Sequence, residues 1–175
     1  MPDENKRAAL PLNQCGVLIA GGTSGVGLAT AIRFAREGSR VVINGRDAGR
    51  GEAARQQALA AVPGADISFV AGDCNTVEGA AAVCGAAEAA LGGAVDVLVN
   101  STVGPYGPKL FHNIALTDVP DIVAKQMMAP LLTARAVWDG MRRKGGGAIV
   151  NIASDAGKVT TPGETVIGAA MAGII

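Results

Sequence analysis

Short apolar runs alternate along this chain with longer, alanine-rich amphipathic stretches. Each apolar run is continuous, with hydrophobic side chains on successive residues, which is typical of strands that helices cover on both faces. The runs predict strands at residues 15–20, 41–44, 67–71, 95–100 and 148–153. The amphipathic stretches between them predict helices over about 25–37, 47–61, 76–91 and 119–143.

This strand–helix order predicts a parallel sheet whose connections are right-handed crossovers. The fold class is therefore α/β, and we expect a Rossmann-type, doubly wound parallel sheet in a three-layer α/β/α arrangement. A chain of 175 residues suits one domain better than two, so residues 1–175 are expected to form a single domain. In the longest predicted helix, Pro130 should cause a kink. Trp138 and Met141 fall at helical spacing there, and we expect both side chains in the core.

Composition and charge exclude several classes of function. The chain carries 15 basic and 15 acidic residues, so there is no basic excess to bind nucleic acid or an anionic membrane surface. No apolar run is long enough to cross a membrane, and the polar N-terminal residues do not resemble a signal peptide. Cys15, Cys74 and Cys84 are an odd number without a CxxC spacing, which favours reduced, buried thiols. We therefore expect a cytoplasmic protein that acts on a small molecule and holds no metal.

A glycine-rich loop, AGGTSGVG, follows the first predicted strand and precedes the first predicted helix. Gly21 permits a tight turn off the strand, while Gly25 and Gly27 let the backbone approach a diphosphate and let the helix pack on the sheet. The diphosphate would lie at the helix N-terminus, where unpaired N–H groups and the helix dipole favour an anion. In this context the loop predicts nucleotide binding rather than an ordinary flexible turn.

The end of the second predicted strand bears on which nucleotide is bound. Proteins that bind NAD usually place an acidic residue there to accept a hydrogen bond from the ribose 2′-hydroxyl. This chain instead has Asn44-Gly45-Arg46, with no acid before Asp47. A guanidinium can form two hydrogen bonds to a 2′-phosphate, so the sequence favours NADP over NAD. The alternative is that Arg46 is a solvated residue at the start of the next helix.

Further motifs follow the third and fourth predicted strands. Asp73-Cys74 comes after one, and Asn100 closes the other. Together with the glycine loop and the Asn-Gly-Arg turn, they make the chain resemble the short-chain dehydrogenase/reductase family from about residue 14 to the last residue. The resemblance implies that Asp73 and Cys74 line the adenine pocket, although Asp73 could instead be a helix N-cap. It also implies that Asn100 begins the family's NNAG motif, which here reads on as Ser101-Thr102-Val103-Gly104. The expected cofactor contacts are thus Gly21, Thr23, Ser24, Gly25, Val26, Gly27, Asn44, Arg46, Asp73, Cys74, Asn100, Ser101 and Thr102.

The same resemblance locates the catalytic positions. Ser154, in the segment IVNIASDAG, matches the family serine that polarises the substrate carbonyl, and Gln126 is the best match to the helix Asn of the proton relay. Ile167 and Met171 occupy the positions of the family's catalytic Tyr and Lys. An isoleucine has no proton to give and a thioether carries no charge, and losing a general acid typically costs about 10²–10⁴ in rate. The family's usual mechanism therefore cannot operate in this chain.

Three interpretations stay open. Another residue can supply the acid: Tyr106, the only tyrosine, lies on a loop expected at the sheet's carboxyl edge, and Lys158 and Glu164 lie on the loop after Ser154. Alternatively, the protein is a divergent oxidoreductase whose substrate needs no such acid, for example an activated enone or an acyl thioester adduct. In either case the resemblance implies hydride transfer to or from a small carbonyl, alcohol or enone substrate. In the third interpretation it binds the nucleotide without turnover, as a sensor or an oligomer partner.

The family fold continues with a sixth and a seventh strand, which are absent from this chain. The apolar stretch VIGAAMAGII, residues 166–175, begins a further helix without an evident partner in the sequence. An exposed apolar helix usually marks an association surface, and family members commonly associate through this helix and the long one before it. We expect either a homodimer or homotetramer, or a fragment of a longer protein.

Overall fold

The computed structural model describes residues 10–175, which contain one five-stranded sheet. The strands β1 (Gly16–Ala20), β2 (Arg40–Gly45), β3 (Ile67–Ala71), β4 (Val97–Asn100) and β5 (Ala148–Asn151) are all parallel, in the order β3-β2-β1-β4-β5. The α/β class and the doubly wound parallel sheet are thus confirmed. β4 begins later and β5 ends earlier than predicted. An apolar run can be longer than its strand, because residues of the flanking loop are buried as well; Val95, for example, is fully buried but lies outside β4.

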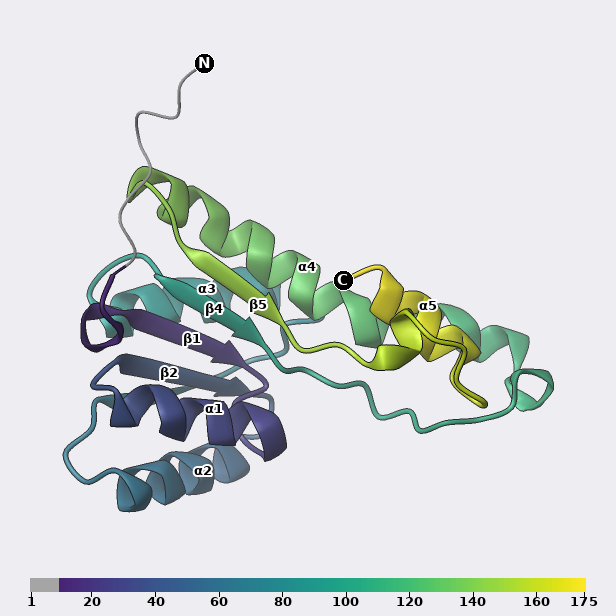
Figure 1. The fold of residues 1–175 in the computed structure, drawn as a ribbon, viewed down its shortest axis with the longest axis horizontal. Coiled ribbons are helices and arrows are strands. Elements are labelled where there is room, and N and C mark those ends of the chain that lie inside the picture. The colour runs from purple at the N-terminus through teal and green to yellow at the C-terminus, as the bar shows by residue number, and fades with distance from the viewer. Residues whose placement is uncertain (1–9) are drawn as a thin grey trace.

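The helices form a layer on each face of the sheet. They are α1 (Gly25–Arg36), α2 (Ala48–Ala61), α3 (Val77–Leu91), α4 (Val119–Arg143) and α5 (Thr165–Ala172). α1 and α2 cover one face, and α3 and α4 cover the other (Figure 1). Within residues 10–175, no helix has both the length and the apolar character that a membrane span requires.

Successive strand residues point to opposite faces and so supply two cores. On β1, Val17 and Ile19 pack with residues of α1 and α2, whereas Leu18 packs with residues of α3 and α4. Both faces are apolar because both are covered, which explains why the strands read as continuous hydrophobic runs.

The prediction that Trp138 lies in the core is wrong. Met141 is 4% exposed and faces the sheet, but Trp138 is 55% exposed. Trp138 lies with Arg142 and Ile149 along an open apolar groove beside β5, the last strand of the sheet. Helical spacing indicates which side of α4 a residue occupies, but not how far the sheet extends beneath that side.

The expectation that residues 166–175 lack a partner within the chain is also wrong. They form α5, which packs against α4 beyond the carboxyl ends of the strands (Figure 1). Val166, Met171 and Ile174 are buried, each less than a tenth exposed. The apolar character of this stretch therefore reflects packing inside the chain, and it no longer argues by itself for an association surface.

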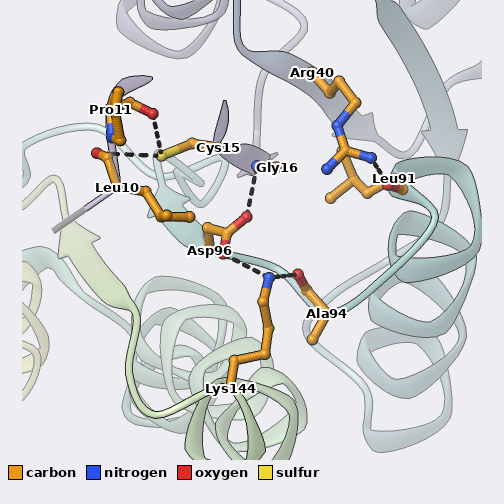
Figure 2. Close-up of polar contacts among 9 residues, drawn as sticks. All are labelled: Leu10, Pro11, Cys15, Gly16, Arg40, Leu91, Ala94, Asp96 and Lys144. Carbon is orange, nitrogen blue, oxygen red and sulfur yellow. Dashed lines mark hydrogen bonds and ion pairs between the residues drawn. The ribbon is translucent and has the colours of Figure 1, made fainter. Parts of the chain in front are cut away.

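A charged clamp fixes the amino-terminal side of the sheet (Figure 2). Asp96, 6% exposed, precedes β4 and accepts a hydrogen bond from the backbone N–H of Gly16 at 2.8 Å. Lys144, at the C-terminal end of α4, donates to the other carboxylate oxygen at 2.5 Å and to the carbonyl of Ala94 at 2.6 Å. On the same side, Arg40 donates to the carbonyl of Leu91. The clamp joins β1, β4 and α4 at the edge of the sheet opposite the candidate site.

Candidate functional site

Four strands end in register at the carboxyl edge of the sheet. Asn44 pairs with Ala20, Ala20 with Asn100, and Asn100 with Asn151. The loops that follow these strands therefore lie together. In open α/β sheets this edge is where ligands bind, and the residues predicted for the cofactor and for catalysis are gathered there.

Two glycines of the loop between β1 and α1 have no room for a side chain. Gly21 has φ +78°, and a Cβ there would lie 2.5 Å from the carbonyl oxygen of Ser101. A Cβ on Gly27 would lie 2.2 Å from the carbonyl oxygen of Gly21, because α1 passes directly over the loop. These two glycines are thus required by close backbone approach, as the sequence predicted.

Gly25, by contrast, faces open space. It has φ +50°, and nothing among residues 10–175 lies within 4 Å of where its Cβ would be. Ser24, the N-cap of α1, makes no side-chain capping bond within this region, and Val26 is 58% exposed. The first N–H groups of α1 are accordingly left for another acceptor, and the backbone there has the space that a diphosphate needs.

Two charged side chains lie on the loops that follow β2 and β3. Arg46 is exposed just after β2, and Asp73 is half-buried after β3. Burial opposes ionisation of Asp73, but hydrogen bonds from Asn75 and the charges of Arg46 and Lys125 hold the pKa of its carboxyl below the ordinary value. Thr76 is the N-cap of α3, so capping that helix is not the role of Asp73.

Asn44 and Cys74 are internal supports of this edge. Asn44 is 2% exposed, and its amide donates to the carbonyls of Val70 and Gly72 at 3.0 and 3.1 Å. The thiol of Cys74, 3% exposed, donates to Oδ1 of Asn44 at 3.2 Å. Burial raises the pKa of Cys74 to about 12. Any contact of Asn44 or Cys74 with a nucleotide therefore has to come from the backbone.

Asn100 is the centre of a buried amide network. Its Oδ1 accepts from the Thr133 hydroxyl at 2.8 Å, and its Nδ2 donates to Asn151 Oδ1 at 3.0 Å. Asn151 Nδ2 then donates to the carbonyl of Ile174 at 3.0 Å, just beyond α5. The network ties β4, α4, β5 and α5 together. Thr133 and Asn151 were not identified from the sequence, because only their hydrogen-bond partners in the fold mark them as part of this network.

The residues after Asn100 lie against the glycine loop. The carbonyl of Ser101 and the N–H of Thr102 are the atoms that exclude a side chain at Gly21. Thr102 Oγ1 is one of two buried side-chain polar atoms without a hydrogen-bond partner in the described part of the chain; the other is Asn75 Oδ1. Both belong to loops at the carboxyl edge of the sheet, on either side of the glycine loop.

Ser154 is half-buried after β5 and acts as the N-cap of a short 3-10 helix, Asp155–Gly157. Its Oγ accepts from the Ala156 N–H at 3.2 Å. It also lies 3.3 Å from a carboxylate oxygen of Glu164 and 3.4 Å from one of Asp155. The structure therefore brings Ser154 and Glu164 together. Such a contact is needed if Glu164 is to replace the family acid.

Tyr106 lies elsewhere, on the loop between β4 and α4. Its hydroxyl donates to the Asp121 carboxylate, which also accepts from Lys125 Nζ at 2.8 Å. The hydrogen bond to Asp121 raises the pKa of Tyr106, and Lys125 beside the ring opposes that shift. Tyr106 and Ile167 line one cavity of about 180 Å³. The tyrosine thus borders the same cavity as Ile167, but its proton is directed at the Asp121 carboxylate.

Gln126 and Met171 are both buried. Gln126, 4% exposed, accepts from the backbone N–H of Gly104 at 3.2 Å and so attaches the loop after β4 to α4. Met171 is 5% exposed on α5. Within residues 10–175, no cluster of His, Cys, Asp and Glu is arranged to hold a metal.

Comparison with known proteins gives a consistent result. A family model described as short chain dehydrogenase matches residues 16–175. D-beta-hydroxybutyrate dehydrogenase from Cupriavidus necator is 30% identical and aligns over 94% of this chain and 62% of its own length. D-threitol dehydrogenase from Mycolicibacterium smegmatis is 34% identical, with 90% of this chain and 59% of its own length covered.

Solved structures agree with these relatives. An actinorhodin polyketide ketoreductase variant with NADPH superposes with a TM-score of 0.84 at 28% identity, covering 93% of this chain and 62% of that one. Levodione reductase gives 0.85 at 25% identity, covering 92% and 62%. The chain thus spans about three fifths of the length of the proteins it matches.

Proposed function

The chain belongs to the short-chain dehydrogenase family, and we propose that it is an oxidoreductase that binds NADP(H) and transfers hydride to or from a small carbonyl, alcohol or enone substrate. One observation carries the cofactor assignment: the N-terminus of α1 is open beside Gly25, and its N-cap, Ser24, makes no side-chain capping bond to any residue of 10–175. Such a site favours a diphosphate through N–H donors and the helix dipole. The nicotinamide, when bound, supplies the hydride.

The residues present fit this cofactor. In the proposal, Gly21, Thr23, Ser24, Gly25, Val26 and Gly27 hold the diphosphate, Asp73 and the backbone of Cys74 bound the adenine, and Asn100, Ser101 and Thr102 bound the nicotinamide side. The open cradle at Gly25 and the unpaired hydroxyl of Thr102 support the assignment.

The preference for NADP rests on Arg46. This side chain is exposed beside the end of β2, and its charge acts on Asp73 across the loops. A ribose 2′-phosphate placed there would meet a guanidinium suited to paired hydrogen bonds. Asn44 contributes by stabilising the turn and not by contacting the nucleotide, since its side-chain amide already bonds to Val70, Gly72 and Cys74.

In the proposed reaction, Ser154 donates a hydrogen bond to the substrate oxygen and so stabilises charge that develops there. Gln126 acts by holding the loop at Gly104. Tyr106 is retained as a candidate proton donor because it shares a cavity with Ile167. A role of Tyr106 as the proton donor requires that Tyr106→Phe slow turnover without changing cofactor affinity.

Titration calorimetry with NADPH and NADH tests the cofactor proposal directly. We expect NADPH to bind more tightly than NADH, and Arg46→Ala to remove most of that difference. Arg135→Ala is a matched control, because Arg135 is an exposed arginine of α4 paired only with Asp139 among the described residues. Failure of both coenzymes to bind would refute the proposal, and tighter binding of NADH would refute the role of Arg46.

The second candidate is a protein that binds nucleotide without turnover, as a sensor or an oligomer partner. Ile167 and Met171 favour it, since they stand where the family carries its Tyr and Lys. Tight NADPH binding without turnover on ketones, enones, acyl thioesters or alcohols would establish this candidate.

We also propose a homodimer or homotetramer located in the cytoplasm. Leu131 and Trp138 of α4 are both about half exposed, at 45% and 55%, which supports association through this helix. Analytical ultracentrifugation tests the assembly, and a stable monomer would exclude it.

A further inference from the structure

We propose that Glu164 is the proton acceptor of this site, that it works with Ser154, and that the reaction it serves is alcohol oxidation. The inference rests on the proposed function, because it assumes that an oxidised nicotinamide cofactor removes the hydride. The observation behind it is the contact between Ser154 Oγ and Glu164 Oε2, at 3.3 Å.

Glu164 is placed where the missing acid–base group should act. It is half-buried and immediately precedes α5, the helix that carries Ile167 and Met171. Glu164 and Ile167 are three positions apart, and such positions lie on the same side of a helical turn. The carboxylate thus contacts Ser154 Oγ from a residue that precedes Ile167 by three positions. The N-terminus of α5 also favours a negatively charged group at this point.

The competing groups around Ser154 are less suited to take a proton. Asp155 lies 3.4 Å from Ser154 Oγ, but it is exposed and belongs to the 3-10 helix that Ser154 caps. Lys158 is exposed on the following loop. Tyr106 is bonded to Asp121, so its hydroxyl already donates to a carboxylate. Glu164 is thus the half-buried carboxylate in contact with the serine.

The step balances as follows. The alcohol carbon loses hydride to the oxidised nicotinamide, and the alcohol oxygen keeps the bonding electrons of its O–H bond to form the carbonyl. The alcohol proton passes to Ser154 Oγ while the serine proton passes to the Glu164 carboxylate. The products are a ketone or aldehyde, the reduced cofactor and a protonated Glu164, which returns its proton to water.

The proposed group suits the proton transfer that alcohol oxidation requires. A tyrosine is protonated at neutral pH and can give its proton to an alkoxide, whereas a carboxylate is ready to accept one. A glutamate at this site therefore supplies a proton acceptor for an alcohol, while the substrate and the cofactor set the equilibrium between alcohol and ketone. The substrate class is a small secondary alcohol or polyol.

The test compares oxidation of D-threitol, D-beta-hydroxybutyrate and 2-propanol by the full chain with NADP⁺, using four variants. We expect Glu164→Gln and Ser154→Ala each to lower kcat by about 10²–10⁴, and Asp155→Asn to stay within a few-fold of the wild type. Tyr106→Phe, the fourth variant, tests the competing proton donor. The dissociation constant for NADP⁺ and the melting temperature should be unchanged in Glu164→Gln, which separates loss of a proton acceptor from loss of the fold or of the cofactor site.

Chemical rescue gives a second readout. Added formate should restore part of the activity of Glu164→Ala, because a small carboxylate can fill the space, and it should not help Ser154→Ala. Activity that survives in Glu164→Gln, or is lost in Tyr106→Phe instead, would overturn the proposal. Absence of turnover on every alcohol, with NADP⁺ still bound, would also overturn it and would leave cofactor binding standing.

Discussion

The buried clamp of Asp96 and Lys144 gives the strongest stability prediction. Asp96→Asn keeps the side-chain size but removes the charge that faces Lys144 at 2.5 Å and weakens the acceptor for the Gly16 N–H at 2.8 Å. The Asp96 side chain is 7% exposed, so water cannot replace what is lost there.

Breaking a buried pair by changing one partner costs about 3–5 kcal/mol. The Lys144 side chain is 28% exposed and can turn partly toward water, so we expect a cost at or just below the lower end of that range, about 2–3 kcal/mol. In a domain of 150–250 residues each kcal/mol shifts Tm by about 2–4 °C, so Asp96→Asn should lower Tm by roughly 4–12 °C.

Calorimetric unfolding of the wild type, both single variants and the double variant Asp96→Asn with Lys144→Met measures the coupling between the two residues. We expect the double variant to be less destabilised than the two single changes together, because the charge left unpaired by the first change is removed by the second. Additive effects, or a loss below about 1 kcal/mol for Asp96→Asn, would refute the view that this contact is a stabilising buried ion pair.

Further predictions concern the glycines, the thiols and the tryptophan. Gly21→Ala should abolish NADPH binding in calorimetry, since its Cβ meets backbone at 2.5 Å, whereas Gly85→Ala, in open space on α3, should stabilise the protein by about 0.5–1 kcal/mol in urea unfolding. Burial raises the pKa of Cys74 to about 12 and of Cys84 to about 11, so both should resist a disulfide reagent at pH 8 until the protein unfolds. Rapid labelling of the native protein would contradict the predicted resistance. Because these folded pKa values lie above the ordinary 9.0, the stability that the buried thiols contribute is full below pH 9 and should be lost progressively between pH 9 and 12. Iodide should quench Trp138 fluorescence efficiently, given its 55% exposure, and protection from iodide would show that this face is covered by a second copy.

The sequence by itself determined the layered fold and the place of the glycine loop between β1 and α1. Continuous apolar runs, set by burial on both faces, predicted all five strands, and helical periodicity predicted α4 to the residue. Gly21 and Gly27 could be recognised from their spacing, because the close backbone approach that requires glycine occurs within one strand, the turn after it and the next helix. That Ile167 and Met171 stand at the positions of the family Tyr and Lys stays a prediction from the sequence.

The tertiary structure alone decided how distant segments meet. It placed Asn100 in contact with Asn151 and Thr133, brought Glu164 to Ser154, and turned the hydroxyl of Tyr106 toward Asp121. It also corrected the positions expected for Trp138 and for α5. Periodicity fixes the direction of a side chain within its own element, but the partner of that side chain depends on strand order, register and where the sheet ends. Those quantities are set by packing across the whole chain, and no local pattern encodes them.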